Sequence, residues 1–104
     1  MAAYVVFMRD ETFNPAELEA YSATVGTSFE GHDVEFLADY GALETLEGKE
    51  IEGAVILRFP NVDAARAWYR SPAYQASAQH RFQAAKYRGF IVDGLEGALR
   101  SVQL

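Results

Sequence analysis

The sequence predicts an α+β domain in which four antiparallel strands form one sheet and two helices cover one of its faces. Three observations support this fold class. Apolar runs and helical patterns follow one another in the order strand, helix, strand, strand, helix, strand. The 104 residues have the size of one domain, and no linker or repeat divides them. Half of the residues are hydrophobic and 23% are charged, as in ordinary folded domains. We therefore predict a single domain over residues 1–104.

The first strand and helix have clear local signals. Ala3 to Met8 is a run of β-branched and aromatic residues and is predicted to form a strand. Asn14 and Pro15 then indicate a helix start, with Asn14 as the N-cap and Pro15 in the first helical position. Gly26 is the predicted stop, although the pattern continues toward Phe29. The expected buried stripe consists of Leu18, Tyr21, Ser22 and Val25.

The middle of the chain predicts two strands. From Asp33 to Leu46 the hydrophobic period changes to two, with an interruption at Tyr40-Gly41. Leu43 to Leu46 is predicted to resume the strand as a bulged continuation. Ala54 to Phe59 is the most apolar strand of the chain and is ended by Pro60.

The last third predicts a broken helix and a final strand. Asn61 caps a helix over Val62 to Arg70, and Pro72 disfavours helical geometry at Ser71. The helix should restart over Ala73 to Lys86 before a strand over Tyr87 to Asp93. The buried stripe of this second piece is expected to be Tyr74, Ala78, Phe82 and Ala85. With right-handed crossovers, this order gives a ferredoxin-like βαββαβ sandwich.

The composition of two strands predicts a homodimer. Tyr4 to Met8 and Val55 to Phe59 are apolar on both faces, apart from Arg58. Two helices cover only one face of a four-stranded sheet, and a sheet with one wet face normally alternates apolar with polar residues. The second face must therefore be buried, and a second copy of this chain is the simplest cover.

The composition also excludes several classes of protein and of functional site. The chain has no cysteine, which removes disulfide frameworks, Cys-ligated metals and thiol nucleophiles. Its formal charge is −6, without the concentrated basic face that nucleic acids require. No apolar run approaches the roughly 20 residues that cross a bilayer, and no signal-peptide pattern is visible. We expect a cytoplasmic protein that binds neither nucleic acid nor membrane.

Several sequence motifs between Leu46 and Gly94 resemble a known family. They are Leu46-Glu47-Gly48, Ile56 to Pro60, Trp68-Tyr69-Arg70-Ser71-Pro72-Ala73-Tyr74, Arg81 and Asp93-Gly94. Together they look like domain of unknown function family 1330, within the dimeric α/β-barrel superfamily. The resemblance implies two ferredoxin-like protomers with their sheets facing each other. That superfamily includes cofactor-free monooxygenases, polyketide cyclases, muconolactone isomerases and haem-degrading enzymes, but the family has no settled reaction.

The sequence also departs from this family. Its members carry Arg-Gly-Gly after the second strand, whereas this chain has Asp39-Tyr40-Gly41. If that arginine binds an anionic ligand in relatives, the ligand here should differ or be absent.

The candidate catalytic residues are Asp39, Tyr69 and His80. Asp39 adjoins the interruption at Gly41. If its side chain points into the barrel, it is a desolvated carboxylate suited to proton transfer. The alternative is a charge in water at the edge of a strand. His80 could act as a general acid or base, as histidine often does in enzymes, and the alternative is a residue of the helix surface. Tyr69 offers a hydroxyl that could orient or protonate a ligand, and the alternative is that its ring belongs to the core.

The candidate ligand-binding residues are Trp68, Tyr74, Arg81 and Tyr40. Trp68 and Tyr74 either anchor the helix break in the core or line a pocket beside it. Arg81 matches a position of the family and alternatively forms an ion pair. The two histidines lie far apart in the sequence, and no nucleotide-binding or hydrolase motif is present, so we expect no metal and no cofactor.

Two functions remain open from the sequence. The first is a cofactor-independent enzyme, an isomerase, cyclase or monooxygenase-like protein that moves a proton on a small organic molecule. The second is a non-catalytic dimeric module that binds a metabolite or has a purely structural role. The acidic composition favours a neutral or weakly charged ligand, unless Arg81 or Arg58 faces inward.

Overall fold

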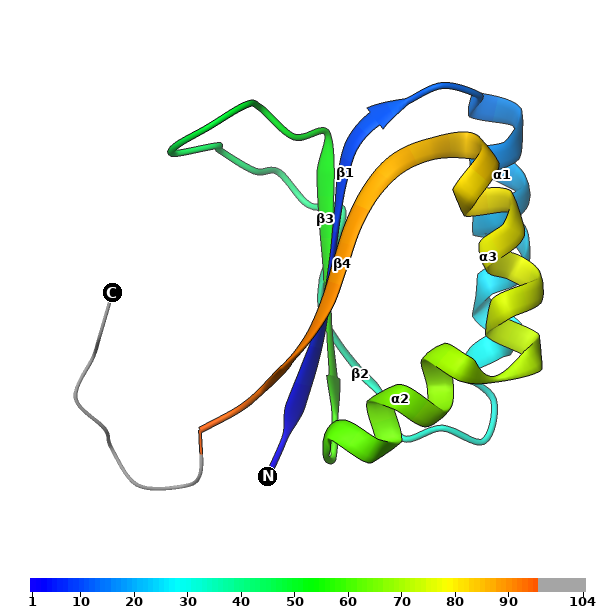
Figure 1. Ribbon diagram of the computed structural model, residues 1–104, viewed down its shortest axis with the longest axis vertical. Coiled ribbons are helices and arrows are strands. Elements are labelled where there is room, and N and C mark those ends of the chain that lie inside the picture. Colours follow the sequence, from blue (N-terminus) through cyan, green and yellow to red (C-terminus); the bar gives the residue numbers. More distant parts are fainter. Residues whose placement is uncertain (96–104) are drawn as a thin grey trace.

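The computed structural model describes residues 1–95 and confirms the predicted α+β order (Figure 1). The four strands form one antiparallel sheet in the spatial order β2-β3-β1-β4, which is the ferredoxin-like arrangement. The single-domain prediction runs to residue 104, and its last part, 96–104, lies outside the described residues. The elements are β1 (Ala3–Thr12), α1 (Pro15–Thr24), the short 3-10 helix η1 (Val25–Phe29), β2 (Glu35–Asp39), β3 (Gly53–Phe59), α2 (Val62–Arg70), α3 (Pro72–Ala84) and β4 (Ala85–Asp93).

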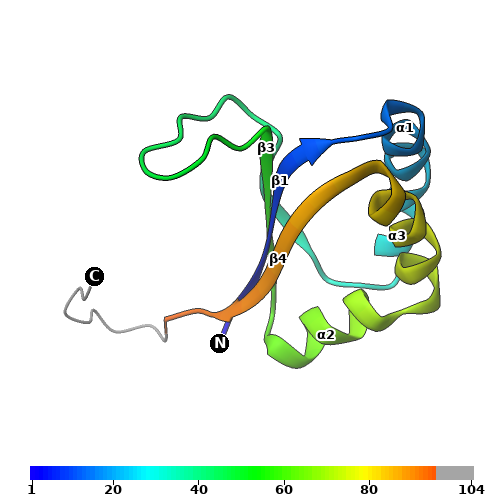
Figure 2. The ribbon, with the colours of Figure 1, turned by 45° about the horizontal axis from the view of Figure 1, so that its top comes forward.

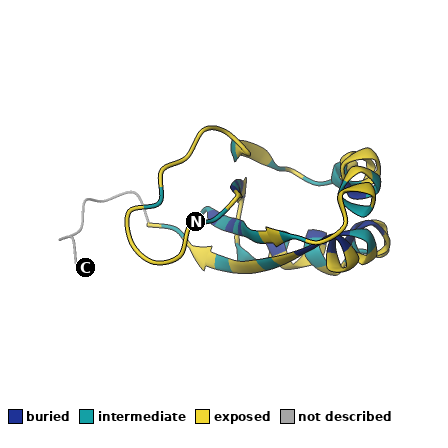
Figure 3. Cartoon of the chain, turned by 90° about the horizontal axis from the view of Figure 1, so that it is seen from above, coloured by how far each residue is buried: buried dark blue, intermediate teal, exposed yellow. Residues whose placement is uncertain are grey.

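The predicted continuation of the second strand over Leu43 to Leu46 is wrong. β2 ends at Asp39, and Tyr40 then adopts the left-handed backbone conformation, with φ at 54°. This conformation turns the chain out of the sheet. The following segment, which we call the β2–β3 loop (residues 40–52), projects on the side opposite the helices (Figures 1 and 2). The loop is exposed along most of its length (Figure 3).

The predicted break at Pro72 is confirmed, and Ser71 serves both helices. Its hydroxyl donates to the backbone oxygen of Trp68 at 2.7 Å and accepts from the backbone N–H of Tyr74 at 3.2 Å. Ser71 therefore ends α2 and caps α3, which holds the aromatic residues on either side of the break close together. Asn14 caps α1 as predicted, accepting from the N–H groups of Ala16 and Glu17.

The core lies between the sheet and the helices. Alternate residues of β1 and β3 point toward the helices, where Trp68 and Tyr74 meet them. The buried stripe of α3 differs from the prediction, because Phe82 is 50% exposed and Arg81 is buried in its place. In α1 the only buried residue is Tyr21, and Ser22 is exposed.

The opposite face of the sheet carries apolar residues without helices above them (Figure 1). Val6 pairs with Ile56 on one side and with Phe90 on the other, so the three side chains share this face. Phe90 and Val92 are 47% and 46% exposed. Within residues 1–95, no helix has the length and apolar character needed to span a membrane.

Candidate ligand-binding site

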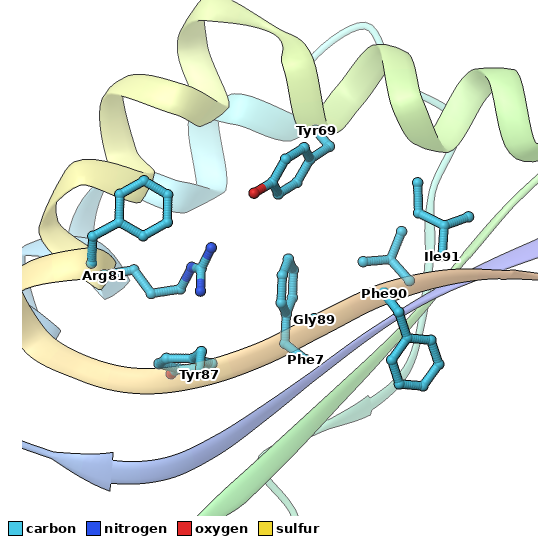
Figure 4. Close-up of a pocket in the computed structure, with 9 residues that line it drawn as sticks. Phe7, Tyr69, Arg81, Tyr87, Gly89, Phe90 and Ile91 are labelled. Atoms are coloured by element: carbon cyan, nitrogen blue, oxygen red, sulfur yellow. The ribbon is translucent and has the colours of Figure 1, made fainter.

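A cavity of about 400 Å³ opens between the helices and the β1–β4 side of the sheet (Figure 4). Its volume falls in the range of small-molecule sites, roughly 300–1,000 Å³. Antiparallel pairing sets Val5 opposite Ile91 and Phe7 opposite Gly89, so these residues face the helices together. The complete lining is Val5, Phe7, Tyr69, Arg81, Phe82, Tyr87, Gly89, Phe90 and Ile91.

Gly89 allows the ring of Phe7 to lie against β4. A Cβ atom at Gly89 would stand 2.6 Å from two atoms of that ring, closer than real side-chain contacts come. Any larger residue at this position would therefore displace Phe7 and change the shape of the cavity.

Arg81 is the charged group of the cavity, and it is only 6% exposed. Its Nε donates to the hydroxyl of Tyr74 at 3.2 Å. The guanidinium carbon also lies 4.8 to 5.0 Å from the ring centroids of Phe7, Phe82 and Tyr87. Such cation–π contacts contribute about 0.5–2 kcal/mol each, depending on how far the cation is desolvated. The aromatic rings thus hold a cation away from bulk water.

No carboxylate within residues 1–95 forms an ion pair with Arg81. Its terminal nitrogens lie instead within the space that the lining residues enclose, beside the ring of Phe7 (Figure 4). Burying a cation without a counter-charge is unfavourable unless polar or aromatic partners compensate. The guanidinium therefore presents donors to the cavity that no described side chain occupies.

A buried pair of tyrosines supports Arg81 from behind. The hydroxyls of Tyr21 and Tyr74 lie 3.0 Å apart. Burial raises the pKa of both phenols above the ordinary value, although Arg81 acts against this rise at Tyr74. Both phenols stay neutral near pH 7, so neither offers Arg81 a negative charge.

Of the residues predicted as site residues, the structure places Tyr69 and Arg81 in the cavity lining. The hydroxyl of Tyr69 is directed toward the side of the cavity where Arg81 lies (Figure 4). Tyr74 is fully buried and reaches the cavity only through its hydrogen bond with Arg81.

Trp68, Asp39 and Tyr40 line a different, smaller cavity of about 190 Å³. Phe7 is the one residue that the two cavity linings share. Tyr40 is nevertheless linked to the first cavity, because its hydroxyl lies 2.6 Å from that of Tyr87. Asp39 is exposed at its strand edge.

His80 lies apart from both cavities. Its Nδ1 atom is 2.7 Å from a carboxylate oxygen of Glu17, so the side chain joins α3 to α1. The structure does not bring this imidazole together with Tyr69 or Arg81. Among residues 1–95 there is also no group of three or more His, Asp or Glu side chains that could hold a metal ion.

Sequence reasoning missed Phe7, Tyr87 and Gly89 as site residues. Their positions depend on the register between β1 and β4, which the sequence does not specify. Gly89 did offer one signal, because glycine inside a strand often marks a close approach by another group. The cavity as assembled offers a cation, a phenol and aromatic walls, a combination that suits a planar organic molecule with hydrogen-bond acceptors.

An open four-stranded antiparallel sheet, with its helices on one face and a cavity between the two layers, defines a ferredoxin-like α+β protein. Residues 2–95 match the family described as "Domain of unknown function (DUF1330)". The chain belongs to this family, as the sequence motifs indicated.

Solved structures share the fold at low sequence identity. The methylated RPA0582 protein is 19% identical with a TM-score of 0.71, over 91% of this chain and 82% of that one; RPA0582 comes from Rhodopseudomonas palustris. A dimeric ferredoxin-like protein of unknown function from Thermobifida fusca is 16% identical with a TM-score of 0.62, over 89% and 91%. SnoaB from Streptomyces nogalater, a cofactor-independent oxygenase, is 13% identical with a TM-score of 0.58, over 92% and 95%. No curated protein sequence matches the chain.

Proposed function

We propose that this protein is a homodimer that binds a small organic molecule in the cavity beside Arg81. The observation that carries the proposal is the buried Arg81 guanidinium, which faces a cavity of about 400 Å³ without a carboxylate partner among residues 1–95. A side chain used only for packing would not need to present hydrogen-bond donors to an open space.

The remaining cavity walls define what kind of molecule fits. Phe7, Tyr69 and Ile91 offer aromatic and aliphatic surface, and the Tyr69 hydroxyl adds a second polar group. Binding sites for small molecules typically combine such apolar walls with a few converging polar groups. The ligand is therefore expected to be a compact, largely apolar molecule with one polar end.

The homodimer is supported by the apolar face of the sheet that carries no helix. Ferredoxin-like relatives of known structure are described as dimeric, among them the Thermobifida fusca protein. In our proposal two such faces pack together into an α/β barrel, which leaves each cavity on the helix side of its own protomer. We further propose that this dimer is cytoplasmic.

A second candidate function is cofactor-independent catalysis on the same ligand. It is supported by the fold shared with SnoaB and by the chemistry of Arg81. A guanidinium in an apolar cavity stabilises negative charge that develops on a ligand as a water molecule takes a proton from the ligand. Tyr69 is the proposed catalytic hydroxyl, whereas Asp39 and His80 lie outside this cavity. Binding is therefore the better supported of the two functions.

The binding proposal is tested by filling the cavity. Ile91→Trp places a large side chain in the lining, and Ala76→Trp places the same side chain on the exposed face of α3. A library of aromatic fragments is screened by NMR against both variants and the unmodified protein. We expect fragments to shift the resonances of the cavity residues in the unmodified protein and in Ala76→Trp, but not in Ile91→Trp. If no fragment shifts these resonances in any of the three proteins, the proposal is wrong.

Catalysis is distinguished from binding by hydrogen exchange on a bound fragment in D2O. If the protein is an enzyme, exchange at carbon is accelerated by the unmodified protein and slowed in Tyr69→Phe. If hydrogen exchange at carbon is equally fast with and without the protein, the catalytic proposal is wrong and only the binding function remains.

A further inference from the structure

We infer that the ligand carries one carboxylate group, which the Arg81 guanidinium binds through its terminal nitrogens while the organic body lies against Phe7 and Ile91. This inference rests on the proposed function, and it adds the chemical class of the ligand.

Arg81 differs from the other arginines of the described chain. Arg9, Arg58, Arg66 and Arg88 each pair with a carboxylate, at 3.0, 3.2, 3.5 and 2.9 Å respectively. Arg70, like Arg81, has no such pair, but it is exposed to water on α2. Arg81 alone among residues 1–95 combines burial with the lack of an ion-pair partner.

The guanidinium of Arg81 has a defined orientation. The hydrogen bond from Nε to the Tyr74 hydroxyl fixes one edge of the group, and Tyr74 is itself held by Tyr21. The terminal nitrogens are therefore turned toward the cavity, as Figure 4 shows. A planar guanidinium fixed in this way matches the two oxygens of a carboxylate, which accept two parallel hydrogen bonds.

The charge of Arg81 is not balanced inside the cavity. The described lining contains one cation and no anion: its other members are aromatic, aliphatic or glycine. One negative charge on the ligand would neutralise Arg81, whereas a neutral ligand would leave the cation without a counter-ion in an apolar setting. A group with two negative charges would bring one unpaired charge into the same setting. A single carboxylate is the best match.

A ligand with one carboxylate also agrees with the expectation from the composition, which was a neutral or weakly charged ligand unless an arginine faces the cavity. With a formal charge of −6, the protein disfavours strongly anionic ligands unless an arginine faces inward. Arg81 faces inward, and Arg58 pairs with Glu35 at the surface instead. A monocarboxylate remains a weakly charged ligand in the sense of the sequence-based expectation.

The test compares acids with their amides, which have nearly the same shape but no charge. Benzoate and benzamide, then phenylacetate and phenylacetamide, are titrated into the unmodified protein at pH 7 while the cavity resonances are followed by NMR. Because charged hydrogen bonds are worth more than neutral ones, we expect each acid to bind about tenfold tighter than its amide. Phenyl phosphate is included as a doubly charged alternative and should bind more weakly than benzoate.

Two variants connect this preference to the arginine. Arg81→Met is expected to remove the preference for the acid, because the loss of the guanidinium weakens acid binding more than amide binding. Arg70→Met, at an exposed arginine of α2, should retain the full preference. Arg81→Lys keeps the charge but loses the planar fork, so its preference should be intermediate. If Arg81→Met does not fold, the acid-to-amide ratio of the unmodified protein and of Arg81→Lys still decides the question.

The outcomes separate this inference from the proposed function. If amides bind as tightly as acids, or if phenyl phosphate binds tightest, the carboxylate assignment is wrong and the binding function stands. If fragments bind but Arg81→Met keeps the acid preference, a group other than Arg81 selects the charge, and the inference also fails. If neither these probes nor the fragment library perturbs the cavity, the proposed function fails together with the inference.

Discussion

The hydroxyl oxygens of Tyr40 and Tyr87 lie 2.6 Å apart, and their contact connects the end of β2 with β4 across the two intervening strands. The ring of Tyr40 lies against Gly53 of β3, and the Arg9 guanidinium stands 4.9 Å from the centre of that ring. Tyr40 has a positive φ of 54°, which is unfavourable by about 1–3 kcal/mol for a residue of this kind. The ring and hydroxyl contacts offset this strain and hold the aromatic side chain across the sheet.

Gly53→Ala is expected to destabilise the protein by about 1–3 kcal/mol, because the new Cβ atom would lie 2.6 Å from the Tyr40 ring. Gly41→Ala is the matched control, since nothing lies within 4 Å of a Cβ atom at that position. Urea denaturation measures both variants. In a Tyr40→Ala background the cost of Gly53→Ala should largely disappear. If Gly41→Ala and Gly53→Ala lower the free energy of unfolding equally, the close packing of the Tyr40 ring against Gly53 does not cause the effect.

Trp68→Ala is expected to lower the free energy of unfolding by about 3–5 kcal/mol. Trp68 is 1% exposed, its ring centroid lies 4.2 Å from that of Tyr74, and its Nε1 donates to the hydroxyl of Ser28 at 3.1 Å. Denaturant titration gives the value, and Ser28→Ala isolates the smaller contribution of the hydrogen bond. An intact fold with a loss near zero would show that Trp68 does not anchor the helix break.

Val6→Glu is expected to convert the proposed dimer into a monomer. Val6 lies on the face of the sheet without helices, between Ile56 and Phe90. A carboxylate buried there without a partner would cost several kcal/mol in an interface between two copies. Sedimentation at micromolar concentration should show a dimer for the unmodified chain and for Gln83→Glu, an exposed position of α3. A folded monomer of 11.5 kDa in the unmodified protein, at every concentration tested, would refute the dimer.

Stability should fall as the pH is lowered below about 5, because two carboxyl groups have lowered pKa values in the folded state. The hydrogen bond from Arg88 lowers the pKa of Asp10, and the hydroxyl of Thr12 lowers that of Glu52. A lowered folded pKa stabilises the protein above the ordinary carboxyl values, about 4, and this contribution is lost as the pH falls through the folded pKa.

Thermal unfolding between pH 7 and pH 3 measures this effect. The double variant Asp10→Asn and Glu52→Gln should show a flatter dependence than the unmodified protein. Glu47→Gln, at an exposed position of the β2–β3 loop, should keep the original slope. An unchanged slope in the double variant would mean that other groups cause the acid sensitivity.

Local signals predicted most of the fold. The caps at Asn14 and Asn61 and the Ser71-Pro72 break each act within a few residues, and the structure places all three where the sequence indicated. The predicted continuation of β2 over Leu43 to Leu46 is wrong. The left-handed conformation of Tyr40 depends on contacts with β3 and β4, which no local sequence pattern contains.

The site was accessible from the sequence only in part. Tyr69 adjoins the helix break and Arg81 follows it on α3, so both could be proposed from motifs. Hydrophobicity predicted that Phe82 is buried, but Arg81 is buried in its place. Aromatic rings from β1 and β4 surround the Arg81 guanidinium and make this burial possible. These partners come from opposite ends of the chain, and the sheet register that joins them is a property of the whole fold.

The position of Phe7 in both cavity linings has a consequence for the length of molecule that this fold accepts. The ring of Phe7 borders both a cavity of about 400 Å³ and one of about 190 Å³. We expect a shorter side chain at this position to enlarge the space available between Arg81 and Trp68. In the proposed binding function, the length of the ligand would depend on this one side chain, whereas the charge that anchors the ligand would come from a separate element, α3.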